Sequence, residues 1–179
     1  MEKKKIVIIG PESTGKSTLS QDLAGALQTV WVPEYARSYL EGLGREYTEA
    51  DLLQIARGQL SLEDTLAATA KDYLVCDTDL YVLKVWSEHS YGRCDTDLLR
   101  WIAERRYDLY LLTYIDIDWV DDPLREHPQP EMRKYFYNVY KDIVTNSSVP
   151  WLEVRGTRDE RLAQALKGVE SLSDMRGDV

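Results

Sequence analysis

The chain has 179 residues and carries 31 acidic against 22 basic side chains, a formal net charge of −9. Its length fits one domain with a sizeable core, and its acidic balance argues against a nucleic-acid partner. No apolar run approaches the roughly 20 residues of a membrane span, and the apolar part of the N-terminal segment is too short for a signal peptide, so we expect a cytoplasmic protein. Cys76 and Cys94 form neither a metal-ligand spacing nor a disulfide framework.

Strand and helix patterns alternate along the chain. Short apolar runs predict five strands, at residues 5–9, 29–34, 71–79, 107–115 and 149–154. Helical spacing of apolar residues predicts helices at 17–27, 34–43, 48–70, 79–91, 95–105, 131–144 and 159–172. We therefore expect an α/β fold, a doubly wound five-stranded parallel sheet with helices on both faces.

The outline of the domain follows from these elements. We expect one domain over residues 1–172 and a flexible C-terminal tail over residues 173–179. The charged, proline-rich segment 121–133 follows the fourth strand and is predicted to act as a lid. Thr48 and Asp51 predict a capping box at the start of the helix at 48–70.

The stretch "GPESTGKST", residues 10–18, lies between the first strand and the first helix. It satisfies G-x-x-x-x-G-K-[ST], in which glycines let backbone N–H groups surround phosphate oxygens at a helix N-terminus. Lys16 would reach the β- and γ-phosphates, and the Ser17 hydroxyl would bind Mg²⁺. A chance glycine turn is the alternative. The predicted ATP-binding residues of this P-loop are Gly10, Glu12, Ser13, Thr14, Gly15, Lys16, Ser17 and Thr18.

Two carboxylates, Asp77 and Asp79, end the third strand, at the sheet edge where open α/β sheets bind ligands. Alternation along an extended segment would place both on one side of the chain. We expect one to serve the metal, with Asp77 as a ligand, and the other to orient or deprotonate the hydroxyl that accepts the phosphoryl group. The alternative for Asp79 is that it caps the next helix.

The second strand ends in "EYAR", so Glu34, Tyr35 and Arg37 are predicted to bind the acceptor substrate at the same rim. The alternative is an ion pair on a surface helix. Trp86 falls near this proposed pocket, where aromatic faces and carboxylates would favour a flat cationic ring. Core packing is the competing explanation for Trp86.

Three arginines are candidates to contact the nucleotide. Arg125 or Arg133, both in the predicted lid, could neutralise transition-state charge, and we favour Arg125 as the catalytic residue. Arg158, after the last strand, is predicted to lie beside the adenine. Solvated surface arginines, and a helix N-terminus capped by Thr157, are the alternatives.

The motifs "GPESTGKST", "VPEYAR", "CDTDLYVLKVW", "WVDDPLR" and "WLEVRGTRDERL" together resemble the nicotinamide riboside kinase domain of bacterial NadR-type proteins, grouped with AAA-like ATPases. The resemblance runs from residue 5 to about residue 170. It implies a P-loop kinase fold, ATP and Mg²⁺ as cofactors, and phosphorylation of nicotinamide riboside to its mononucleotide in NAD biosynthesis.

The resemblance also assigns positions within the site. Residues 15–18 fall on the ATP-phosphate positions, and Arg125 falls in the lid. The positions that face the acceptor are Glu34, Tyr35, Arg37, Asp77 and Asp79. Bifunctional NadR proteins carry an adenylyltransferase domain ahead of the kinase, whereas this chain begins a few residues before the P-loop, so we expect a stand-alone kinase.

Two other functions fit the same motifs. One is a kinase for another nucleoside or for a nucleoside monophosphate, and the other is an ATP-dependent switch without kinase activity. The chain has no N-K-x-D guanine motif, which disfavours GTP. A small-molecule riboside is the expected partner, and a homo-oligomer is compatible with the sequence.

Overall fold

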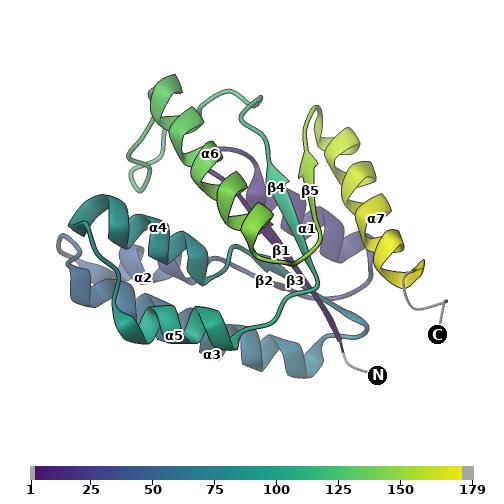
Figure 1. The fold of residues 1–179 in the computed structure, drawn as a ribbon, viewed down its shortest axis with the longest axis horizontal. Helices are drawn as coiled ribbons and strands as arrows, with labels where there is room; N and C mark the ends of the chain where they lie inside the picture. Colours follow the sequence, from purple (N-terminus) through teal and green to yellow (C-terminus); the bar gives the residue numbers. More distant parts are fainter. Residues whose placement is uncertain (1–2, 175–179) are drawn as a thin grey trace.

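The sheet has five strands, and every strand pairing in it is parallel. The computed structural model describes residues 3–174 and places the strands in the order β2-β3-β1-β4-β5 (Figure 1). The predicted fold class is confirmed. The strands are β1 Lys4–Ile9, β2 Trp31–Val32, β3 Tyr73–Asp77, β4 Leu109–Thr113 and β5 Trp151–Val154.

Seven helices are described, close to the predicted ranges. They are α1 Lys16–Ala26, α2 Tyr35–Leu43, α3 Glu49–Thr69, α4 Leu80–Tyr91, α5 Thr96–Glu104, α6 Pro130–Asn146 and α7 Arg158–Asp174. Helix α7 runs two residues past its predicted end at 172, and residues 175–179 of the predicted tail lie outside the described residues. Strand β2 is shorter than the predicted 29–34 and ends before Pro33, which has no N–H to donate to a neighbouring strand.

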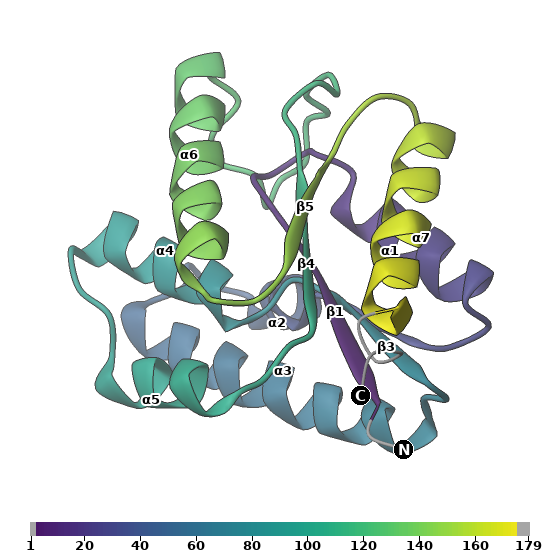
Figure 2. The same ribbon diagram turned by 45° about the vertical axis from the view of Figure 1, so that its right-hand side comes forward.

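Residues 6–9 of strand β1 are apolar and fully buried because helices cover both faces of the sheet. Ile6 and Ile8 pack on the side of α1 and α7, whereas Val7 and Ile9 pack on the side of α6. Figure 2 shows α1 and α7 together on one side of the strands and α6 on the other. Each of these buried side chains contributes about 1.5–3 kcal/mol, and together they fix the start of α1 beside the end of β1.

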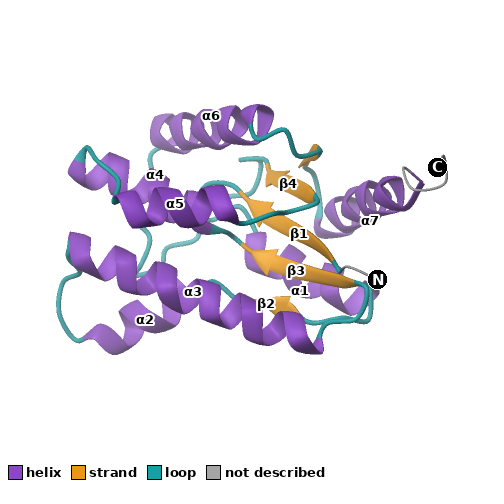
Figure 3. Ribbon diagram, turned by 60° about the horizontal axis from the view of Figure 1, so that its bottom comes forward, coloured by secondary structure: helices purple, strands orange, loops and turns teal. Residues whose placement is uncertain are grey.

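A third core joins α2, α3, α4 and α5 next to the short β2 edge of the sheet (Figure 3). Its centre includes Ala36, Leu52, Ile55, Leu80 and Leu98. The predicted capping box between Thr48 and Asp51 is present at the start of α3. Within residues 3–174, no helix combines the length and the apolar character that crossing a bilayer requires.

The register of the strands brings the functional segments together. Ile8 of β1 lies beside Asp77 of β3, and Ile9 lies beside Leu112 of β4. The P-loop therefore leaves β1 between the ends of β3 and β4, at the carboxyl edge of the sheet, where open α/β folds bind their ligands.

Candidate active site

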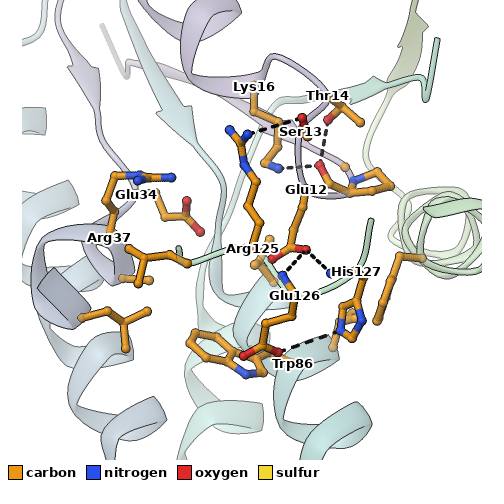
Figure 4. A pocket seen from close by; sticks show the side chains of 18 of the residues that line it. Glu12, Ser13, Thr14, Lys16, Glu34, Arg37, Trp86, Arg125, Glu126 and His127 are labelled. Atoms are coloured by element: carbon orange, nitrogen blue, oxygen red, sulfur yellow. Dashed lines mark hydrogen bonds and ion pairs between the residues drawn. The ribbon is translucent and has the colours of Figure 1, made fainter. Parts of the chain in front are cut away.

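A cavity of about 370 Å³ opens at the carboxyl edge of the sheet (Figure 4). Residues 10–18, the whole predicted P-loop, form one end of it. The predicted residues Glu34, Arg37, Trp86 and Arg125 also line the cavity, from α2, α4 and the segment between β4 and α6. We refer to that segment, residues 114–129, as the lid. Residues far apart in the sequence are thus gathered around one volume large enough for a small-molecule ligand.

The P-loop backbone takes conformations that favour glycine. Gly10 has φ 151° and Gly15 has φ 78°, and Ser13 also has a positive φ, 54°. A Cβ at Gly10 would lie 2.2 Å from Oγ1 of Thr113, so a larger residue cannot replace it without displacing β4. Helix α1 begins at Lys16, directly after Gly15, so its positive dipole end faces the cavity.

Short side chains and Lys16 hold this turn in place. The Thr14 and Thr113 hydroxyls are hydrogen-bonded at 2.7 Å, and the Thr14 hydroxyl also donates to the Pro11 carbonyl at 2.8 Å. Nζ of Lys16 donates to the same carbonyl at 2.7 Å (Figure 4). The cation is therefore held against the phosphate-binding turn itself.

Arg161, which was not among the predicted site residues, supports the P-loop from α7. Its side chain is 3% exposed and donates to the carbonyls of Thr14 (2.6 Å), Gly156 (3.0 Å) and Tyr114 (3.1 Å). It also forms an ion pair with Asp116. A buried guanidinium with several partners is costly to disrupt, so Arg161 ties the P-loop to the loops after β4 and β5.

The helical spacing of apolar residues in α7 could have predicted that Arg161 is buried. It stands four and eight residues before Ala165 and Val169, both buried against the sheet. This spacing places the arginine on the buried face of α7 rather than on its solvent face.

Asp77 is buried, 2% exposed, and hydrogen-bonds the Ser17 side chain. Burial raises the pKa of the carboxyl, although the Ser17 hydrogen bond and the Lys16 charge lower it. Its Oδ1 is buried without a hydrogen-bond partner among the described residues. An unpartnered buried oxygen next to a hydroxyl is the donor set that Mg²⁺ accepts in phosphate sites, where it is bound by one or two protein oxygens and by the substrate phosphates. Asp77 and Ser17 thus fit the ion.

Asp79 points elsewhere, so the expected alternation with Asp77 is wrong. Thr78 between them has φ 71°, which ends the extended conformation that alternation requires. Asp79 caps α4 by accepting from the Tyr81 N–H at 2.9 Å, and it accepts from the Tyr110 hydroxyl at 2.7 Å. Burial raises the pKa of Asp79 to about 7, although these hydrogen bonds lower it. The alternative role as a helix cap is the one observed.

Glu34, directly before α2, and Arg37, in α2, both line the cavity. Burial raises the pKa of Glu34, and the Lys16 charge opposes that shift. Arg37 forms an ion pair with Asp122 of the lid at 3.0 Å. Tyr35, also predicted to bind the acceptor, does not line the cavity. Its ring packs on α3, where a Cβ at Gly58 would lie 2.0 Å from it.

The lid contacts the P-loop directly. Nη1 of Arg125 donates to the Ser13 hydroxyl at 3.4 Å, and Nη2 of Arg133 donates to the Ser13 carbonyl at 3.2 Å. The Glu12 carboxylate accepts from the N–H groups of Glu126 and His127 at 3.1 and 3.2 Å (Figure 4). Both arginines line the cavity, so cationic groups face the P-loop from the lid and from α6.

Arg158 lies outside the cavity. It is 69% exposed and pairs with Asp22 of α1 at 2.6 Å. Thr157 and Glu160 exchange hydrogen bonds at the start of α7, as the alternative of a capped helix predicts. The expected contact of Arg158 with adenine has no support from its position.

A family model described as an AAA domain matches residues 5–161. The chain belongs to this AAA domain family. It is 27% identical to the trifunctional NAD biosynthesis/regulator protein NadR of Escherichia coli K12, over 98% of this chain and 43% of the relative. The protein of the same name from Salmonella typhimurium LT2 matches with the same identity and coverage. The chain thus spans less than half the length of these curated relatives, and the predicted resemblance to NadR-type proteins is confirmed.

Solved structures agree on the fold. A crystal structure of NadR protein in complex with NR superposes with a TM-score of 0.80 at 21% identity, covering 96% of this chain and 52% of that one. Thymidylate kinase from Candida albicans superposes with a TM-score of 0.66 at 16% identity, covering 96% and 93%. The fold is therefore that of the P-loop kinases.

Proposed function

We propose that the protein is an ATP- and Mg²⁺-dependent kinase that phosphorylates the 5′-hydroxyl of nicotinamide riboside. The observation that carries this proposal is the cavity itself, which has a P-loop at one end and an acidic, aromatic wall at the other. The similarity to NadR, one structure of which contains NR, supports the choice of acceptor.

The P-loop end binds the triphosphate. Backbone N–H groups of residues 10–18 and the start of α1 face the phosphate oxygens, and Lys16 contacts the β- and γ-phosphates. Ser17 and Asp77 would hold Mg²⁺, which when bound would neutralise charge on the β- and γ-phosphate oxygens. Arg125 and Arg133 stabilise the negative charge that develops on the transferred group.

The acceptor end orients the hydroxyl. Of the acidic groups predicted to face the acceptor, Glu34 lines the cavity and has a raised pKa, so it is suited to accept a proton. In the proposed step the hydroxyl proton passes to Glu34, a bond forms between the 5′-oxygen and the γ-phosphorus, and the bond from that phosphorus to the β-γ bridging oxygen breaks to release ADP. The lid would limit access of water to the γ-phosphate.

The acceptor wall suits a flat cationic ring. Trp86 and Tyr47 offer aromatic faces, and Glu34, Glu46 and Glu126 line the same cavity. Aromatic faces and carboxylates both attract a cation, as the nicotinamide ring of the riboside requires.

The test is ADP production across a panel of acceptors, with nicotinamide riboside, uridine, thymidine, deoxyadenosine and thymidine monophosphate. Nicotinamide riboside should give the highest kcat/KM, and Lys16→Ala should abolish turnover. Lys71→Ala, an exposed lysine before β3, is the matched control and should leave turnover unchanged. ATP hydrolysis at the same rate without any acceptor would contradict the proposal and favour an ATP-dependent switch.

A nucleoside monophosphate is the second candidate acceptor. Arg37 and Arg45 line the acceptor end and could bind a phosphate, and the fold is shared with thymidylate kinase. A preference for thymidine monophosphate over every unphosphorylated nucleoside would establish this alternative.

A further inference from the structure

Tyr47 lies in the connection between α2 and α3 and lines the acceptor end of the cavity. Its hydroxyl accepts a hydrogen bond from Nε1 of Trp86 at 2.9 Å and donates to Oε1 of Glu126 at 3.3 Å. Its ring meets the Trp86 ring edge-on, with centroids 4.7 Å apart and an interplanar angle of 73°. One side chain thus contacts both α4 and the lid.

A further hydrogen bond joins the lid to the P-loop. The N–H of Glu126, whose carboxylate accepts from Tyr47, donates to the Glu12 carboxylate. Figure 4 shows Trp86, Glu126 and Glu12 following one another across the cavity. Trp86, Tyr47, Glu126 and Glu12 therefore form a continuous hydrogen-bonded chain from the acceptor wall to the phosphate-binding turn.

We propose that Tyr47 is a positioning residue that couples binding of the acceptor at Trp86 to the placement of the lid over the P-loop. This inference rests on the proposed function, because it requires an acceptor at Trp86 and a nucleotide at the P-loop. A ligand that fixes the Trp86 ring also fixes the Tyr47 hydroxyl, and through it the lid segment that binds Glu12. Coupling between binding free energies is reciprocal, so the nucleotide must tighten acceptor binding by the same factor.

The lid has a second contact, with α2, that an experiment can distinguish from the Tyr47 contact by its dependence on salt. Arg37 and Asp122 form an ion pair whose arginine side chain is 43% exposed, so that link should weaken as salt is added. The Tyr47 link is a neutral hydroxyl between an indole N–H and a carboxylate. The coupling that depends on Tyr47 should therefore persist at high salt.

The test uses Tyr47→Phe, which keeps the ring against Trp86 and removes both hydrogen bonds. Calorimetry measures the Kd of a non-hydrolysable ATP analogue with Mg²⁺, with and without saturating nicotinamide riboside. In the wild type the riboside should tighten nucleotide binding about 5- to 10-fold. In Tyr47→Phe the factor should fall below about 2-fold, with the nucleotide Kd in the absence of riboside nearly unchanged. Tyr135→Phe, an exposed tyrosine of α6, is the matched control.

Glu126→Ala interrupts the same chain from the lid side, at a carboxylate that is 49% exposed and so dispensable for folding. Glu126→Ala should reduce the coupling between riboside and nucleotide binding. The double variant with Tyr47→Phe should lose no more coupling than either single variant. Coupling that survives in Tyr47→Phe, in a protein that binds and phosphorylates the riboside, would overturn this inference alone. A wild type that binds nucleotide but no riboside would overturn the proposed function as well.

Discussion

The two ends of the cavity are built from different kinds of structure. The P-loop end is continuous backbone in strained conformations, held by buried groups such as Thr14, Thr113 and Arg161. The acceptor end is made of side chains from α2, α4 and the lid, joined by half-exposed contacts such as the pair between Arg37 and Asp122. Substitutions at the first end should therefore abolish binding or chemistry, whereas substitutions at the second, apart from the proposed base Glu34, should adjust affinity and selectivity.

After Lys16→Ala, Asp77→Asn should have the largest effect, because it removes the charge of the acid beside Ser17 while preserving its size. We expect kcat to fall by about 10²–10³-fold and to require a higher Mg²⁺ concentration, measured by steady-state ADP production across a Mg²⁺ titration. An unchanged Mg²⁺ dependence would exclude Asp77 from metal binding.

Gly10→Ala should weaken nucleotide binding by about 10²-fold. The new methyl group would meet the Thr113 hydroxyl at 2.2 Å, and the residue has φ 151°, so overpacking and backbone strain add. Gly25→Ala, in α1 with open space around it, is the control and should bind ATP normally. Equal affinities for the two variants, by calorimetry, would show that the P-loop end is less constrained than its geometry implies.

Asp79→Asn tests whether this carboxyl acts on the fold rather than on the substrate. The folded pKa of about 7 lies above the ordinary aspartate pKa of 3.8, so the folded state binds more protons between these values. The wild type should then lose stability as pH rises from about 4 to 7, by up to about 1.4 kcal/mol per pH unit from this group. Asparagine can still cap α4 through Oδ1, and its amide nitrogen can donate to the Tyr110 hydroxyl, so the variant should show a flatter pH dependence.

Urea denaturation of wild type and Asp79→Asn at pH 5, 6 and 7 measures this difference. Parallel pH profiles for the two proteins would contradict the raised pKa. A loss of kcat larger than 10²-fold at unchanged stability would return Asp79 to a catalytic role.

Arg37→Ala should have the smallest effect. The exposed pair with Asp122 contributes about 0.2–1 kcal/mol, so we expect KM for the acceptor to rise about 2- to 5-fold at low salt and less at high salt. Arg100→Ala, which removes an exposed ion pair with Asp97 on α5, is the control. A decrease in kcat above 10²-fold would place Arg37 in the chemistry instead.

The sequence by itself determined the fold class and the P-loop. An unbroken apolar strand, a glycine-containing turn and an amphipathic helix follow one another in the chain, so local periodicity and backbone requirements suffice to predict them. The parallel arrangement of the strands follows from their burial on both faces, and the helix ranges follow from the helical spacing of apolar residues.

Only the tertiary structure separated Asp77 from Asp79, because the positive φ of Thr78 that turns them apart leaves no mark in the residue pattern. It also placed Tyr35 and Arg158 away from the cavity, Tyr47 in its lining, and Arg161 against the P-loop backbone. The physical reason is that these side chains are directed by contacts between segments far apart in sequence, and local periodicity carries no information about which distant partner a polar side chain will meet.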